Sequence, residues 1–219
     1  MYKLSFLRLP IFSKGYGNIL KLDEHIEKRY GEGFELVNSS IIDGFVPLNM
    51  RDFEGKKHCV LTSMTAIMAY YRKNGIDLPD DKKLFRDIKK LASRRGLYIP
   101  FIGVNVLTIG LLSKLVWKYF GYKAYSKNKI FLKKKPSAAR IIKEEINNGR
   151  PFFLSFAGGD YENHTTTCYG YEEFEREGKK LLFLLVNDNW STGEKFVDLN
   201  MLASIKTSFF AISTTRPFK

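Results

Sequence analysis

Cys59 is the residue whose type and position point most directly to chemistry in this chain. It follows the letters GKKH and begins a mostly apolar segment, CVLTSMTAIMAYYRKN, at residues 59–74. A thiol at the start of a helix faces unsatisfied backbone N–H groups and the positive end of the helix dipole, and both favour the thiolate. The alternative for an isolated cysteine is a small buried apolar residue. Cys59 is therefore a candidate nucleophile that needs a base.

His164 is the candidate base. It lies in NHTTTCYGY, after a Gly-Gly turn and at the start of a Thr-rich segment that is typical of a strand. The other two histidines are less suitable, because His25 lies in a charged helical segment and His58 is the direct neighbour of Cys59. An imidazole at a strand entrance can accept the proton of a thiol across a cleft. A hydrogen-bonded structural histidine is the alternative.

A third polar group follows the next expected strand. The apolar run LLFLLV leads into the letters NDNW, in which Asp188 is the second. A carboxylate or amide here can hold the imidazole of His164 in the tautomer that accepts a proton. An ordinary Asn/Asp turn has the same composition. The order Cys, His and Asp, each at the end of an element, predicts acyl transfer through a covalent thioester.

Hydrophobic spacing predicts the elements that position these residues. Helices are expected near residues 23–30, 59–74, 81–94, 107–120 and 137–148, and strands near 152–156, 164–171, 181–186, 195–197 and 209–214. Helices followed by strands predict an α+β domain at residues 44–219, with a helical lobe at about 44–149 packed on an antiparallel sheet lobe at about 150–219. Residues 1–43 are an N-terminal extension without an assigned role.

Composition limits the other classes of function. The net charge is +13, and the densest basic run, residues 127–135, holds five lysines. Without a nucleic-acid recognition motif, a solvated surface is favoured over a nucleic-acid site. Neither a signal-peptide core nor an apolar run of about 18–20 residues is present, so no transmembrane segment and a cytoplasmic location are expected. The oligomeric state stays open.

The cysteines and histidines match no other chemistry. Two cysteines make no disulfide framework, which favours a reducing compartment. Three dispersed histidines and two separate thiols fit no zinc spacing, so neither a metal nor a cofactor is expected. Cys168 follows His164 by four residues on the same strand face, where core packing is the favoured interpretation.

Three motifs resemble the papain-like cysteine peptidases, in particular the compact bacterial branch related to bacteriocin leader-processing (double-glycine) peptidases. In that family a Cys begins the central helix, a His begins a strand in the context N-H-x-x-x-x-G-Y, and an Asp or Asn follows the next strand. The matching segments are HCVLTSMTAIMAYY, NHTTTCYGY and VNDNWST, within residues 44–215. The resemblance implies a papain-like fold, a Cys59–His164–Asp188 triad and a peptide or amide substrate. Further cleft residues are then Asn163, Asn187 and Trp190.

The sequence departs from the family in two ways. Only 105 residues separate Cys59 from His164, which fits the compact branch and not the roughly 130–150 of larger relatives. Phe53 occupies the position of the family's oxyanion-hole Gln, and the chain contains no Gln, so Asn49 is the candidate substitute. Loss of one such donor costs about 100–1,000-fold in rate. A catalytically impaired binding module and an acyltransferase therefore stay open as alternatives.

Overall fold

The computed structural model describes residues 15–131, 136–204 and 209–218. Its helices are α1 (Leu22–Tyr30), α2 (Cys59–Lys73), α3 (Asp81–Arg94), α4 (Ile109–Tyr119), α5 (Pro136–Asn147) and α6 (Leu199–Ser204), with short 3-10 turns η1 (Met50–Asp52), η2 (Val106–Thr108) and η3 (Gly159–Tyr161). Its strands are β1 (Glu35–Ile41), β2 (Tyr98–Ile99), β3 (Gly103–Val104), β4 (Lys123–Phe131), β5 (Phe152–Ala157), β6 (His164–Arg176), β7 (Lys179–Asn187), β8 (Lys195–Asp198) and β9 (Phe209–Phe218).

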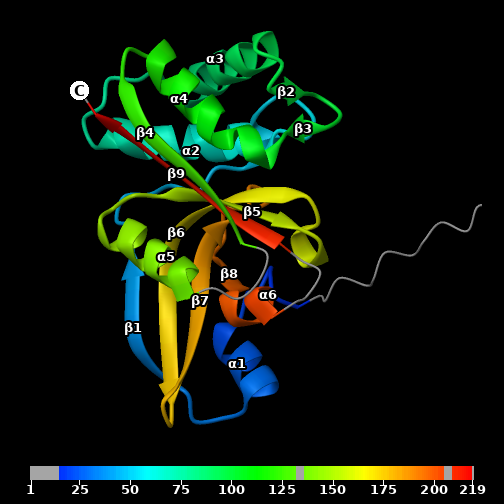
Figure 1. Cartoon of the computed structure of the whole chain (residues 1–219), viewed down its shortest axis with the longest axis vertical. Helices are drawn as coiled ribbons and strands as arrows, with labels where there is room; N and C mark the ends of the chain where they lie inside the picture. The colour runs from blue at the N-terminus through cyan, green and yellow to red at the C-terminus, as the bar shows by residue number, and fades with distance from the viewer. Residues whose placement is uncertain (1–14, 132–135, 205–208, 219) are drawn as a thin grey trace, which may run out of the picture.

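A seven-stranded antiparallel sheet forms the larger part of the molecule. Six strands run in the order β4-β9-β5-β6-β7-β8, and β1 pairs with the far half of β6. Helices α2, α3 and α4 gather with the β2–β3 hairpin in a separate lobe at one end of this sheet (Figure 1). The α+β class predicted from the sequence is confirmed.

Helix α2 joins the two halves because it is apolar on almost every side. Ten of its fifteen residues are buried, as expected for a helix enclosed by protein. Leu61, Met64 and Ile67 belong to the core of the helical lobe, whereas Ala66 packs into the core of the sheet. Phe153 of β5 contributes in turn to the helical core. The N-terminus of α2 is thereby fixed against the sheet, where β6 begins.

The sequence placed the central helices well and missed four strands. The helix expected at residues 81–94 has those bounds in the structure, and the one expected at 59–74 ends one residue earlier. Strands β1, β2, β3 and β4 were not expected, and β6 and β7 extend closer to the turn that joins them than predicted. The basic run at 127–135 lies partly in β4, and its residues 132–135 fall outside the described residues.

Part of the segment that the sequence left without a role belongs to the sheet. Strand β1 lies along β6, with Ile41 opposite Gly170. A side chain at Gly170 would come within 3.1 Å of the Ser40 carbonyl oxygen, so glycine allows this close approach. Within the described ranges, none of the helices is long and apolar enough to cross a membrane.

The carboxylate of Asp198 anchors α1 to the sheet. It is fully buried and accepts hydrogen bonds from Tyr30 at 2.6 Å and from the backbone N–H of Asn200 at 2.9 Å, and it lies 3.0 Å from His25. Burial by itself raises the pKa of Asp198, but these hydrogen bonds more than offset it and hold the pKa below its ordinary value. Asp198 is therefore charged in the folded protein.

Asp198→Ala should destabilise the fold by about 3–5 kcal/mol, because it leaves buried donors and His25 without their partner. The measurement is the free energy of unfolding in urea at pH 7, with the exposed Asp77→Ala as the control. Since the folded pKa of Asp198 is lowered, its contribution is present above pH 3.8 and is lost as the pH falls through the folded pKa. Equal stability of the two variants would contradict this anchoring role.

Candidate active site

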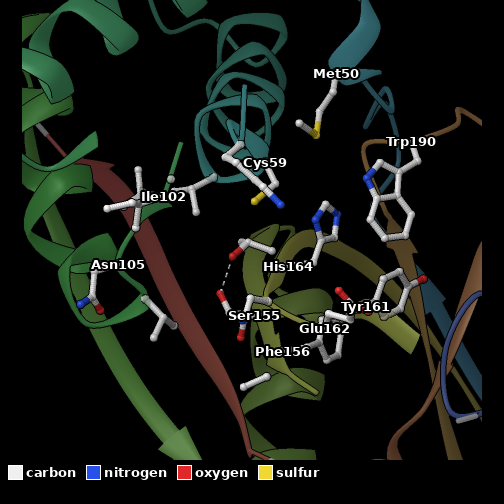
Figure 2. Close-up of a pocket in the computed structure, with 18 of the residues that line it drawn as sticks. Met50, Cys59, Ile102, Asn105, Ser155, Phe156, Tyr161, Glu162, His164 and Trp190 are labelled. Carbon is white, nitrogen blue, oxygen red and sulfur yellow. Dashed lines mark hydrogen bonds between the residues drawn. The ribbon is translucent and has the colours of Figure 1, made fainter. Parts of the chain in front are cut away.

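A cleft of about 680 Å³ lies between the helical lobe and the sheet. The N-terminus of α2, the segment from β3 to η2 and the loop between β5 and β6 form its walls. The residues used below that line it are Lys57, Cys59, Asp160, Tyr161, His164 and Trp190. Figure 2 shows Cys59 and His164 in the same space, with Tyr161 and Trp190 beyond the His164 ring.

Cys59 is the first residue of α2 and is only partly accessible. Burial raises the pKa of its thiol above the ordinary value, although N–H groups of Thr165, Val60 and Cys59 itself and the charge of Lys57 act in the opposite direction. The helix terminus therefore lowers the cost of a thiolate without outweighing its desolvation. The sequence-based expectation of a thiolate-favouring environment is only partly met, since the free thiol is neutral.

His58, the neighbour of Cys59, faces away from the cleft. Its Nδ1 lies 3.0 Å from the Thr62 hydroxyl, and its ring contacts the edge of Phe85 at 5.2 Å between centroids. Burial lowers the pKa of His58, with the nearby Lys89 acting in the same direction. His58 is a neutral structural residue, which leaves His164 as the imidazole of the cleft.

The hydrogen bond made by His164 fixes its tautomer. Its Nε2 lies 2.7 Å from the backbone carbonyl oxygen of Asp188. A carbonyl oxygen only accepts, so Nε2 carries the proton and Nδ1 keeps a lone pair. Burial lowers the pKa of His164, partly opposed by Asp188 and reinforced by Lys57. The ring is therefore neutral at pH 7 and able to accept a proton through Nδ1.

The carboxylate of Asp188 does not reach His164 in this structure. Its Oδ1 accepts the backbone N–H groups of Trp190 at 2.9 Å and Ser191 at 3.0 Å, and its Oδ2 lies 3.3 Å from the Lys195 ammonium. The residue expected from the sequence is thus beside the histidine, but its main chain makes the contact. Its side chain caps the turn that presents that carbonyl.

Asn189 is a site residue that the sequence reasoning missed. Its side-chain amide donates to the Thr165 carbonyl at 2.9 Å, to the Ser63 hydroxyl at 3.0 Å and to the Cys59 carbonyl at 3.4 Å. Asn189 also adopts a positive φ of 63°, which Asn tolerates better than most residues. The available signal was the second Asn of the NDNW turn, which lies one residue beyond the position chosen.

The other candidate residues divide between the cleft and its supports. Trp190 and Asn163 line the cleft, and the Trp190 ring stacks on His164 with centroids 4.2 Å apart. Asn187 does not line it and instead accepts the backbone N–H of Leu48 at 3.0 Å. Its amide donates to the Ser191 carbonyl, so Asn187 fixes the turn.

Asn49 is not brought to Cys59, contrary to the sequence-based expectation. Its amide nitrogen donates to the Trp190 carbonyl at 3.1 Å, its amide oxygen accepts the N–H of Arg51, and it does not line the cleft. Asn49 is used to cap η1. Phe53, at the position of the family's Gln, stacks on Phe85 with centroids 4.5 Å apart.

Cys168 lies away from the cleft, in the core of the sheet. Cys168 is fully buried in the core of the sheet, which agrees with the favoured interpretation, and burial raises the pKa of its thiol. In the part of the chain that the structure describes, no three His, Cys, Asp or Glu side chains gather as a metal site would require.

The comparisons with known proteins found a distant likeness among solved structures. No protein-family model and no curated protein sequence matches the chain. Among solved structures, the crystal structure of UfSP from C. elegans is similar at a TM-score of 0.48 and 13% identity. The match covers 85% of this chain and only 36% of that one. Such a likeness is too distant to transfer a function.

Asp188→Asn tests whether the main chain or the carboxylate holds His164. An amide oxygen can still accept the N–H groups of Trp190 and Ser191, so the turn should persist. We expect the rate of Cys59 alkylation at pH 7 to stay within about tenfold of wild type, or ~1.4 kcal/mol. A carboxylate that holds the imidazole directly is worth about 10⁴-fold in a serine-protease triad.

Asp188→Ala is the matched comparison, because it removes the acceptor that caps the turn. We expect this variant to lose far more of the alkylation rate than Asp188→Asn. An equal, large loss in both variants would mean that the negative charge matters and that the main-chain assignment is wrong.

Proposed function

We propose that this chain is a papain-like cysteine hydrolase in which Cys59 is the nucleophile and His164 the base. The observation that carries the proposal is one cleft lined by both a thiol at a helix start and an imidazole whose Nδ1 has no hydrogen-bond partner among the described residues. Tautomer, position and access are the three properties that a general base for a thiol requires. The main-chain carbonyl of Asp188 acts as the orienting group in this proposal.

The reaction proceeds in two halves. In the first, the Cys59 sulfur attacks a peptide or amide carbonyl carbon while its proton moves to His164 Nδ1. His164 then gives that proton to the leaving amine as the C–N bond breaks, and a thioester with Cys59 remains. In the second half His164 takes a proton from water and the resulting hydroxide attacks the thioester carbonyl carbon. The C–S bond then breaks, the carboxylic acid leaves, and the Cys59 sulfur recovers the proton from His164.

Charge stabilisation in this proposal comes from the start of α2. The backbone N–H of Cys59 is one of the unsatisfied donors of a helix N-terminus and is a candidate for the oxyanion. Lys57 lines the cleft and adopts a positive φ of 53° just before the helix. Its charge favours the thiolate of Cys59 and disfavours the imidazolium of His164. Lys57 therefore adds positive potential to a cleft in which the family's Gln is missing.

The cleft suits a peptide or amide substrate of mixed polarity, since apolar groups such as Ile102, Val104 and Phe209 share its walls with Asn105 and Glu162. The narrower resemblance, to bacterial double-glycine peptidases, stays a prediction, as does the absence of a nucleic-acid partner. The oligomeric state stays open. The Cys59 thiol must stay reduced to act, so the proposal places the activity in a reducing compartment such as the cytoplasm.

A binding module that has lost turnover is the second candidate. Two observations favour it: burial raises the pKa of the Cys59 thiol, and neither Phe53 nor Asn49 offers a side-chain donor to the cleft. It differs from the hydrolase in the role of His164, which would then not influence the thiol. An acyltransferase would share the first half-reaction and replace water by an amine or a thiol in the second.

The pH dependence of Cys59 alkylation by iodoacetamide separates these candidates. Because the pKa of His164 is lowered from 6.5, its ring is a neutral base at pH 7 and is lost as a base only when the pH falls through that lowered value. Wild type should therefore react well between about pH 6 and 8, whereas His164→Ala should react only as the raised pKa of the thiol is approached at alkaline pH.

Two serine variants show which thiol is labelled. Cys59→Ser should remove the label, and Cys168→Ser should leave it unchanged because Cys168 is fully buried. If wild type and His164→Ala share one alkaline profile, the Cys–His pair is not functional and the binding module is the better account. Mass spectrometry of a peptide mixture incubated with wild type and with Cys59→Ser then reveals cleavage or acyl transfer.

A further inference from the structure

Residues 15–19, here called the strap, lie against the loop that carries Tyr161. The strap belongs to the segment for which the sequence offered no role, and it is far in the chain from every candidate site residue. Its Tyr16 is fully buried, and its Ile19 forms a β-bridge with Phe196 of β8. A segment held this firmly next to a cleft is expected to restrict the movement of the residues that line the cleft.

Hydrogen bonds fasten the strap to the loop between β5 and β6. The Asp160 carboxylate accepts the backbone N–H of Gly15 at 2.7 Å and that of Gly17 at 2.9 Å. The Tyr16 hydroxyl donates to the Gly158 carbonyl at 2.7 Å. The backbone N–H of Asn18 donates to the Tyr161 hydroxyl at 3.2 Å. Because these contacts span the whole loop, the loop cannot shift without breaking several of them.

Gly17 leaves room for the Tyr161 ring and for nothing more. A Cβ at Gly17 would lie 2.4 Å and 2.8 Å from two carbons of that ring. Carbon atoms pack at about 3.5–4.0 Å, so even a methyl group must displace the ring by on the order of 1 Å. The strap is thus in direct contact with the Tyr161 ring at a position where only glycine fits.

Tyr161 contacts His164 directly, so the position of its ring affects the imidazole. The two rings stack with centroids 5.9 Å apart and planes at 15°. Tyr161 also lies 5.6 Å from Trp190, which itself stacks on His164 at 4.2 Å, so the three rings contact one another. A displaced Tyr161 ring therefore changes both aromatic contacts of the imidazole.

The other end of the strap is tied to the turn that holds His164 Nε2. Lys195 hydrogen-bonds the Asn18 side chain and lies 3.3 Å from the Asp188 carboxylate. The N–H of Asp198 donates to the Tyr16 carbonyl at 2.7 Å. The strap therefore contacts the Tyr161 loop directly and is linked to the Asp188 turn through Lys195.

We propose that the strap positions His164 for its reaction with Cys59, with Gly17 and Tyr161 as the positioning residues. This inference rests on the proposed function for its consequence in catalysis, while the contacts themselves concern only the orientation of His164. It assigns a role to a segment that touches neither Cys59 nor His164. Misplacement of a catalytic group by 1 Å costs on the order of 100-fold in rate.

Gly17→Ala tests the proposal. The full-length variant should alkylate Cys59 with iodoacetamide about 100-fold more slowly at pH 7, yet match wild type at alkaline pH where the thiol ionises without help. The titration of the His164 ring, followed by NMR, should shift as well. Lys57, Asp160, Glu162 and Asp188, the charged groups at the cleft or the turn beside His164, are unchanged in this variant, so a shift reports geometry.

Gly193→Ala is the matched control, because a Cβ there meets nothing within 4 Å and lies outside the strap. It should behave as wild type in both measurements. Tyr16→Phe is the second test variant, in case Gly17→Ala fails to fold. This substitution removes only the Tyr16 hydroxyl, which donates a hydrogen bond to the Gly158 carbonyl. It should lower the neutral-pH alkylation in the same direction by a smaller factor.

The outcomes separate this proposal from the function on which it rests. If wild type shows His164-dependent alkylation and the folded strap variants match it in rate and in His164 titration, the strap proposal is overturned and the hydrolase proposal stands. If wild type shows no His164-dependent alkylation, the hydrolase proposal fails, and the His164 titration of Gly17→Ala still decides whether the strap orients the ring.

Discussion

The side-chain amide of Asn189 joins the three segments on which the candidate site depends. Its donors reach the carbonyl of Cys59 at the start of α2, the hydroxyl of Ser63 one turn later and the carbonyl of Thr165 at the start of β6. Asn189 itself follows β7. This buried amide adds directed hydrogen bonds to the apolar packing between the thiol-bearing helix, the histidine strand and the orienting turn, and directed hydrogen bonds resist sliding more than apolar packing does.

Burial gives the cleft a neutral resting state. Desolvation raises the pKa of the Cys59 thiol and lowers that of His164, so neither group is charged at pH 7. In the proposed hydrolase, charge separation occurs as the thiol reacts, when the helix N–H groups and the Lys57 ammonium can stabilise it. The reactivity of the thiol at pH 7 then depends on the geometry of His164.

The sequence predicted the residues whose roles follow from their place in a single helix or strand. It missed those whose roles depend on contacts between segments far apart in the chain. Cys59 and His164 each begin an element that periodicity or composition predicts, so their position at element ends follows from the pattern. Strand β1 is an edge strand with almost every residue exposed. Strand β4 alternates exposed and partly buried residues, but Ser126 and Asn128 hold partly buried positions, so its sequence lacks the hydrophobic alternation that predicts a strand. The contact of Gly17 with Tyr161 spans most of the chain and leaves no local signal.

The main-chain contact at Asp188 limits what any motif can say about this site. Every residue type carries a backbone carbonyl, so the hydrogen bond to His164 does not constrain the side chain at position 188. What constrains it is the turn, which needs an acceptor for the N–H groups of Trp190 and Ser191 and a partner for Lys195. An Asp after the strand thus resembles a triad carboxylate because both tasks select the same residue, although here it reaches the imidazole through its backbone.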